Sequence, residues 1–202
     1  MKLWVFFGVI LFLSLFSLNL FPQSIFLEKG VLGIFANGSY AEFENGRSNS
    51  FGGGLALGNT AELGFSFGNS TLEESNYYFT TQKKIKTKNL YLGIVLLEGK
   101  TEINGNIGYA VADDSPGLLN TGISITRKIE FVKNLSCFPT FSAGIGFPIG
   151  KEEAEKIMAV GLTVPVLIAE IVYVGPNAAI SDGKISWGLI AGISLGMTLT
   201  TN

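Results

Sequence analysis

The sequence predicts an all-β chain that folds as an antiparallel, up-and-down transmembrane β-barrel of about ten strands, after an N-terminal signal peptide. Three observations predict this fold. One stretch, residues 186–199, alternates strictly between apolar and small residues. Similar alternating segments recur along the chain between turn residues. The chain is strongly apolar, yet beyond its N-terminus it has no apolar run long enough for a membrane-spanning helix.

The stretch 186–199 has the period of two that marks a β-strand. One face is small or hydroxylated, with Ile190 as the exception. A soluble sandwich strand usually places bulk on one face and charge on the other, whereas a barrel strand places bulk toward lipid and small or polar residues toward the lumen. The apolar face consists of Trp187, Leu189, Ala191, Ile193, Leu195, Met197 and Leu199.

The composition excludes several classes of function. The 202 residues are 47% apolar and 15% charged, with a net charge of −2, so nothing indicates a nucleic-acid partner. Histidine is absent, which excludes Ser-His-Asp and Cys-His catalysis and histidine ligation of zinc or haem. The single cysteine, Cys137, excludes an internal disulfide and is expected to be a small apolar strand residue.

Residues 1–24 are expected to be a secretory signal peptide. Met1 and Lys2 precede an apolar stretch from Leu3 to Phe21, and Ser24 is an acceptable last residue before cleavage. The alternative is an uncleaved N-terminal anchor helix. Residues 25–202 then form one domain, the outer-membrane β-barrel.

Ten alternating segments follow, and each is expected to cross the membrane as a strand. Ten is an even number, as single-chain bacterial barrels require; eight remains the alternative if the eighth and ninth segments do not both cross. Longer, charged loops alternate with short turns, as they do between the two ends of such barrels. The segments are 30–43, 51–58, 61–68, 90–97, 101–111, 119–128, 135–149, 157–167, 170–178 and 186–199.

Two polar stretches are expected to be loops, residues 44–49 and residues 69–89. The second contains Lys83, Lys84, Lys86 and Lys88. It is either a recognition surface for lipid phosphate or for a partner, or a solvated loop. Tight turns are expected at 59–60, near 133–134 and at 181–183.

Five polar residues are candidates for the barrel interior because they lie on the small-residue faces of their segments: Glu62, Glu102, Asn104, Asn106 and Thr126. They indicate either a polar pathway or a hydrogen-bonded network that fills a narrow lumen. Asp113 and Asp114 are better explained by turn chemistry beside Pro116 and Gly117 than by a catalytic pair. We therefore expect no catalytic residue, no cofactor and no metal site.

Six aromatic residues are candidates for the girdles that barrels place at the membrane interface. In a sandwich the same residues would form the core. They are Tyr40, Phe51, Phe67, Tyr109, Phe147 and Trp187.

The signal-like N-terminus, the glycine-rich alternating segments and the glycine-containing last segment together resemble the small outer-membrane β-barrels of the opacity-type and OmpA-like families. The resemblance covers the mature chain and rests on pattern rather than on a diagnostic motif. It departs from those families at the end of the chain, where Leu199 to Asn202 offer no terminal aromatic residue. The histidine-dependent activities of other outer-membrane barrels do not carry over, because this chain has no histidine.

Together, the sequence patterns and the resemblance predict a bacterial outer-membrane protein with a structural or surface-interaction role and no catalysis. Its expected partners are outer-membrane lipid and the barrel-assembly machinery, with the ligand of its outer loops unknown. The alternatives are a narrow pore for small solutes and a secreted, soluble β-sandwich with a binding role. For the last segment we expect arginine to be tolerated at Gly192 and to be costly at Ile193.

Overall fold

In the computed structural model, residues 26–27, 29–76, 79–113, 117–149 and 156–197 are described. The predicted signal peptide, residues 1–24, lies outside these ranges. Among the described residues, no helix is long and apolar enough to span a membrane.

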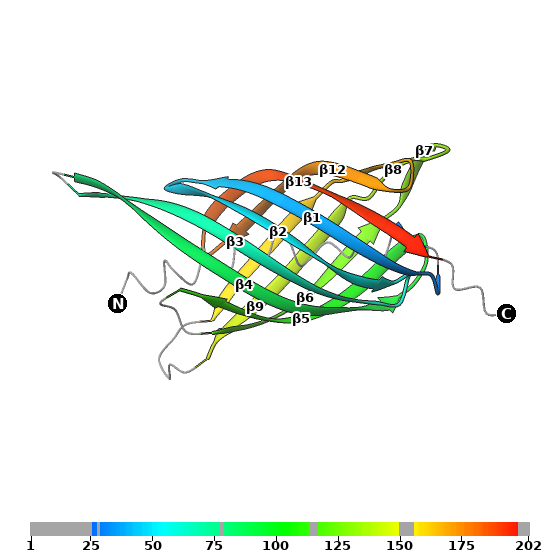
Figure 1. Ribbon diagram of the computed structural model, residues 1–202, viewed down its shortest axis with the longest axis horizontal. Coiled ribbons are helices and arrows are strands. Elements are labelled where there is room, and N and C mark those ends of the chain that lie inside the picture. Colours follow the sequence, from blue (N-terminus) through cyan, green and yellow to red (C-terminus); the bar gives the residue numbers. More distant parts are fainter. Residues whose placement is uncertain (1–25, 28, 77–78, 114–116, 150–155, 198–202) are drawn as a thin grey trace.

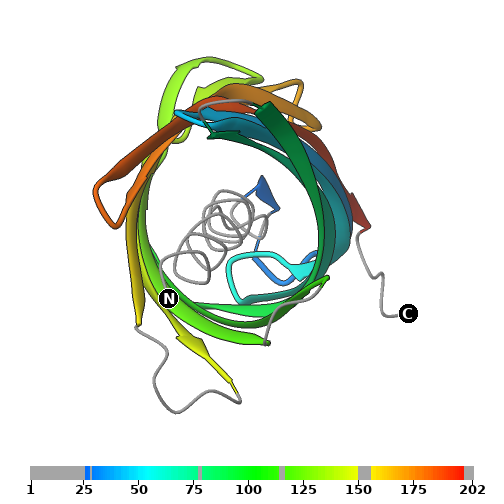
Figure 2. The same ribbon diagram turned by 90° about the vertical axis from the view of Figure 1, so that its left-hand side faces the viewer.

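The described chain is one antiparallel sheet that closes on itself (Figures 1 and 2). Closure is made at two places: β1 pairs with β13 along twelve residue pairs from Leu32↔Met197 to Phe43↔Ser186, and β10 pairs with β12. The alternative of a two-sheet sandwich is therefore wrong. The strands are β1 Leu32–Phe43, β2 Gly46–Leu57, β3 Ala61–Asn76, β4 Phe79–Leu97, β5 Thr101–Ala112, β6 Leu118–Arg127, β7 Ile129–Val132, β8 Leu135–Cys137, β9 Thr140–Pro148, β10 Ile157–Thr163, β11 Val166–Ile168, β12 Val172–Ser181 and β13 Lys184–Met197.

The sheet has 13 strand pieces but forms a barrel of 10 crossings. The difference arises because β7 continues β6, β8 leads into β9 and β11 continues β10. Two of the breaks fall at prolines, Pro139 and Pro165, which have no N–H to donate to a neighbouring strand. The prediction of ten crossings is confirmed, whereas the predicted unbroken segments 135–149 and 157–167 are each divided.

The predicted tight turns are confirmed by backbone conformations that few residues adopt. Asn59 and Asn134 have φ values of 48° and 66°. Asp182 and Gly183, with φ values of 47° and 75°, form the two-residue connection between β12 and β13. A pair with positive φ is the turn whose twist matches antiparallel strands.

The two predicted polar loops are largely wrong. Of 44–49, residues 44–45 form the turn between β1 and β2 but 46–49 belong to β2, and most of 69–89 belongs to the long strands β3 and β4. These strands pair from Ala61↔Ile94 to Asn76↔Phe79, so their hairpin extends well past the rest of the barrel (Figure 1). The apolar alternation in the sequence stops before these strands end. Strand residues beyond the apolar band do not face lipid, so their outward side chains need not be large and apolar.

The outer surface of the barrel is apolar. Side chains on the predicted outward faces remain exposed in the folded chain, including Phe51 at 62% and Trp187 at 59%. A soluble monomer does not present apolar surface on every strand, whereas a transmembrane barrel must. The described chain is therefore a transmembrane β-barrel. Five predicted girdle aromatics, Tyr40, Phe51, Phe67, Tyr109 and Trp187, are exposed, and Phe147 is half-buried.

The expected tolerance of arginine at Gly192 is wrong. Gly192 faces the interior, but its Cα lies under the Tyr173 ring, and a Cβ at this position would overlap the Tyr173 hydroxyl and approach the Ala36 carbonyl oxygen to 2.5 Å. The position is filled by an aromatic side chain from the neighbouring strand rather than by open lumen.

Replacing Ile193 with arginine is expected to destabilise the inserted barrel by about 2–4 kcal/mol, because Ile193 is 42% exposed on the apolar outer face. The measurement is urea unfolding of the protein in lipid vesicles, with unfolding read from the heat-sensitive gel mobility of the folded form. Asn49→Arg is the control, because Asn49 also faces outward but lies beyond Phe51 at the edge of the apolar band. Equal stability of the two variants would contradict the assignment of this face to lipid.

Candidate functional site

The interior of the barrel holds all five predicted lumen residues. Glu62, Glu102, Asn104 and Thr126 are buried, with exposed fractions of 0–7%, and Asn106 is half-buried. They come from three strands, β3, β5 and β6, on the faces opposite the lipid-facing residues. Their positions agree with the alternation in the sequence; their participation in a function stays a prediction.

Strand register gathers these residues on one wall. Glu102 is directly opposite Thr126, and Asn106 is opposite Gly93 of β4. Gly93 is also opposite Glu62, so Glu62 and Asn106 flank the same glycine from two sides. Both carboxylates lie one residue into their strands, after the short turns at Asn59 and Gly99, and therefore near the same end of the barrel.

Part of this wall is tied together by hydroxyl groups. The Thr126 and Thr140 hydroxyl oxygens are 2.8 Å apart, and the Thr140 hydroxyl lies 3.1 Å from the Phe138 carbonyl oxygen. Thr140 donates to the carbonyl, so Thr126 donates to Thr140. This chain links β6 to β9 from inside the barrel and continues the polar surface beyond β5.

The interior also holds amides that were not singled out from the sequence. Asn37, Asn89, Asn120 and Asn177 are all buried on inward faces. Both side-chain polar atoms of Asn89, Asn104 and Asn177 lack a hydrogen bond to any other described group. Such atoms are suited to bind water or a polar solute. The signal that could have identified them was the same period of two that identified Asn104.

A second feature of the interior was not expected from the sequence: it contains an apolar cluster formed by Phe26, Phe138, Leu167, Tyr173 and Ile190. The Phe26 ring meets the Phe138 ring edge-on, with 5.1 Å between ring centroids, and lies 4.8 Å from the Tyr173 ring. The dark-blue start of the described chain lies inside the ring of strands in Figure 2.

Leu27 makes a neighbouring cluster with Phe35, Ala56 and Tyr91. The two clusters adjoin each other on the wall: one involves β1, β2 and β4 and the other β11 to β13, and β1 pairs with β13. Phe26 and Leu27 thus place two neighbouring apolar side chains inside the barrel. Periodicity could not show this, because it assigns a strand residue to a face without showing which other part of the chain packs against that face.

A cavity of about 1240 Å³ opens at the end of the barrel that carries the short turns. Its lining includes Phe26, Leu27 and Phe138, so both apolar clusters contribute side chains to its surface. Two ion pairs lie at its rim, Lys29–Glu98 at 2.5 Å and Lys128–Glu130 at 2.6 Å between nitrogen and oxygen. The Lys128 ammonium group lowers the pKa of the exposed Glu130 carboxyl below its usual range. Glu102, one of the five predicted lumen residues, also lines this cavity.

The described residues contain no group of three or more histidine, cysteine or acidic side chains placed to hold a metal ion. Cys137 is buried, as expected for a small apolar residue. Asp113 is described and exposed, but Asp114 lies outside the described residues, so their role as turn residues stays a prediction. The absence of catalysis also stays a prediction.

No protein-family profile and no curated protein sequence matches this chain. Among solved structures, the chain is similar to the β domain of the Bordetella autotransporter BrkA, with 11% identity, a TM-score of 0.46 and coverage of 81% of this chain and 98% of that one. It is also similar to the KdgM porin, with 6% identity, a TM-score of 0.46 and coverage of 81% and 99%. The N-terminal β-barrel domain of Pseudomonas aeruginosa OprF gives 10% identity, a TM-score of 0.36 and coverage of 83% and 98%. Because these TM-scores are below 0.5, we base the fold on the strand pairing itself.

Replacing Gly64 with alanine is expected to destabilise the barrel by about 1–3 kcal/mol through overpacking. A Cβ at Gly64 would overlap the buried Tyr91 ring and meet no other group as closely. Combining Gly64→Ala with Tyr91→Leu should therefore cost less than the sum of the two single changes, as measured by urea unfolding in vesicles. Gly38→Ala is the control, because its nearest contact would be an ordinary 3.5 Å to the Ser50 carbonyl oxygen. Strict additivity at Gly64 and Tyr91 would contradict this packing.

Proposed function

We propose that this chain is an exported bacterial outer-membrane β-barrel that acts as a surface-interaction scaffold and not as an enzyme. The observation that carries the proposal is the projecting hairpin, which we define as residues 73–76 of β3 and 79–86 of β4. The closed barrel holds this hairpin in place, and the apolar outer face would anchor the barrel in lipid. The predicted signal peptide and the barrel-assembly machinery would bring it there.

The register of the sheet shows where the hairpin leaves the barrel. On one side, β2 ends with Gly46 opposite Leu72. On the other side, β5 ends with Ala112 opposite Thr87. Just beyond these points, the Glu73 N–H donates to the Asn45 carbonyl oxygen and the Asp113 N–H donates to the Lys86 carbonyl oxygen. Farther out, β3 and β4 pair with each other as far as Asn76↔Phe79. The hairpin therefore stands clear of the barrel wall, where a partner can reach it.

The projecting hairpin adds little to the stability of the barrel. A free two-stranded hairpin is at best marginally stable in water. Among its described side chains, Gln82 donates a 3.3 Å hydrogen bond to Glu73, an exposed contact. A segment that does not support the fold and extends beyond the membrane band is best explained by contact with something outside the barrel.

The interior supports a scaffold rather than an open channel. Phe26 and Leu27 place apolar side chains inside the barrel, one in each cluster, and both line the cavity at the short-turn end. Small solutes would have to pass these side chains. With ten strands, the interior is also far narrower than that of the 16- to 18-stranded barrels that leave an aqueous channel.

A narrow pore is the second candidate function. It is favoured by the buried amides of Asn89, Asn104 and Asn177, which lack hydrogen bonds to described groups. It is also favoured by the carboxylates of Glu62 and Glu102 on the same wall. In this case Phe26 and Leu27 would be a movable obstruction in a polar path.

Conductance across planar lipid bilayers separates the two candidates. The unaltered protein is expected to give no stable conductance steps, because the apolar side chains of Phe26 and Leu27 would narrow the lumen. Replacing both Phe26 and Leu27 with serine is expected to produce measurable conductance by widening it. Phe131→Ser is the matched control, because Phe131 lies at the same end but is 59% exposed.

Stable conductance steps from the unaltered protein would overturn the scaffold proposal in favour of the pore. An absence of conductance from the unaltered protein, together with conductance from the Phe26 and Leu27 variant, would support the scaffold. Each preparation is first checked for the heat-sensitive gel shift of a folded barrel, so that silence is not mistaken for failed insertion.

A further inference from the structure

The outward face of β4 changes abruptly from apolar to basic. Leu90 and Leu92 are exposed toward lipid at 56% and 45%. The next outward positions toward the projecting hairpin are Lys88, Lys86 and Lys84, all exposed. Because alternate residues of a strand share a face, these three ammonium groups follow one another at intervals of roughly 7 Å.

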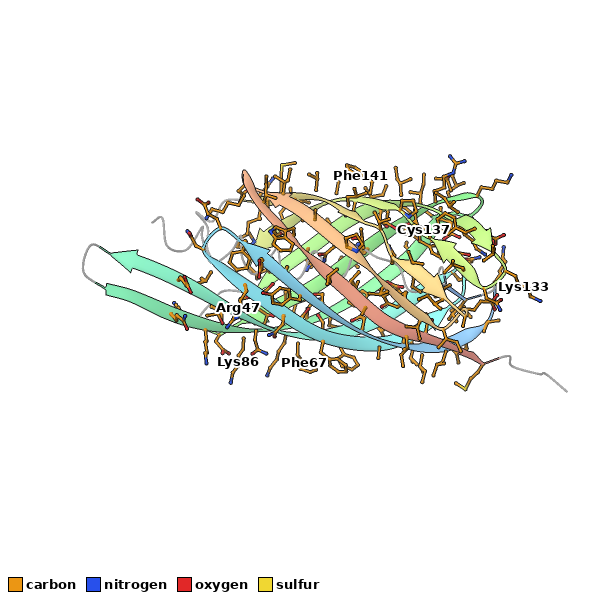
Figure 3. All side chains as sticks on the ribbon, turned by 90° about the horizontal axis from the view of Figure 1, so that it is seen from above. Arg47, Phe67, Lys86, Lys133, Cys137 and Phe141 are labelled. Carbon is orange, nitrogen blue, oxygen red and sulfur yellow. The ribbon has the colours of Figure 1, made fainter. Side chains whose placement is uncertain are left out.

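The outward faces of the neighbouring strands β2 and β3 also change from aromatic to polar at this level of the barrel. Lys88 is opposite Phe67 on β3, and Phe67 is opposite Phe51 on β2. Two outward positions farther out, Lys84 is opposite Thr71, which is opposite Arg47. Figure 3 shows Lys86 and Phe67 pointing away from the barrel wall on the same side. We call Arg47, Lys84, Lys86 and Lys88 the basic patch; it borders an aromatic edge of the apolar band.

Among the side chains that the structure describes, no ion pair involves a residue of the basic patch. The ion pairs Lys29–Glu98 and Lys128–Glu130 both lie at the short-turn end. Three acidic residues lie around the patch. Glu42, opposite Arg47, accepts a 2.6 Å hydrogen bond from the Tyr40 hydroxyl, Glu73 accepts one from Gln82, and Asp113 follows the end of β5. None of them comes within ion-pair distance of the patch, so its like charges repel one another unless an anion binds.

Protection of an open strand edge does not account for the whole patch. Lysines commonly discourage pairing at exposed edges, and β4 is an open edge beyond Lys86, whose carbonyl oxygen accepts a hydrogen bond from the Asp113 N–H. Lys88, however, lies where β4 is paired on both sides, opposite Phe67 and Val111. No edge needs protection there, and the position directly adjoins the apolar band.

We propose that the basic patch binds the phosphate groups of an anionic lipid in the leaflet that it borders. The ammonium groups of Lys86 and Lys88 contact phosphate, while the acyl chains lie along Phe67 and Leu90 below them. Exposed lysines above an apolar surface offer one molecule both a charged and an apolar contact. The inference rests on the proposed insertion of the barrel in a membrane and goes further by naming the lipid class and its site.

The test compares two double variants that each lose two exposed lysines. Lys86→Gln with Lys88→Gln removes the centre of the basic patch. Lys100→Gln with Lys133→Gln removes the same charge at the short-turn end of the barrel. Binding of phosphatidylglycerol and of phosphatidylcholine to each detergent-solubilised protein is measured by native mass spectrometry. Inorganic phosphate is tested as a separate ligand.

The unaltered protein and the short-turn control should prefer phosphatidylglycerol, and the patch variant should bind it roughly tenfold more weakly. Equal preference in the two variants would overturn the site. Binding of inorganic phosphate as tight as binding of phosphatidylglycerol would overturn the assignment to lipid. A missing heat-sensitive gel shift in the unaltered protein would instead overturn the proposed function, whereas a normal shift without lipid preference would overturn only this inference.

Discussion

The structure depends on closure of one hydrogen-bonded ladder. In lipid, a backbone N–H or C=O without a partner is costly, because no water is available to replace the lost hydrogen bond. Every crossing therefore needs a neighbour on both sides. The pairing of β1 with β13 and of β10 with β12 supplies the last of these neighbours. Where prolines interrupt the strands, cross-bonds such as the Phe138 amide to the Pro165 carbonyl, at 2.9 Å, maintain the ladder.

Closure also separates two environments, lipid outside and the lumen inside, that favour different kinds of side chain. The outer face meets lipid and carries bulk, as at Phe65, Leu92 and Trp187. The inner face has limited volume, so a large side chain fits only where a neighbour is small. Tyr91 lies over Gly64 and Tyr173 over Gly192, and these two rings, with Phe26 and Leu27, belong to apolar clusters inside the barrel. Glycines at specific inward positions thus leave room for these aromatic rings.

The same ladder explains why the projecting hairpin and the basic patch sit together. Toward the hairpin, the outward positions of β3 and β4 leave the apolar band and enter the polar region beside it. Residues there are free of the requirement for bulk toward lipid, and Lys84, Lys86 and Lys88 take the place of the leucines that follow them on the same face, Leu90 and Leu92. The proposed contact with partners above the membrane and the proposed lipid site at its border would both use these two long strands.

The sequence by itself determined the number of crossings, the lipid-facing and lumen-facing sets and the placement of Glu62, Glu102, Asn104 and Thr126 in the interior. It could do so because the side-chain period of a strand is local and two faces require two kinds of residue. The tertiary structure decided what local patterning does not encode. The extension of β3 and β4 beyond the apolar band depends on cross-strand pairing, and the packing of Phe26 inside the barrel depends on its cluster with Phe138 and Tyr173, more than a hundred positions along the chain. Such contacts exist only after the barrel has brought distant parts of the chain within reach of the same side chain.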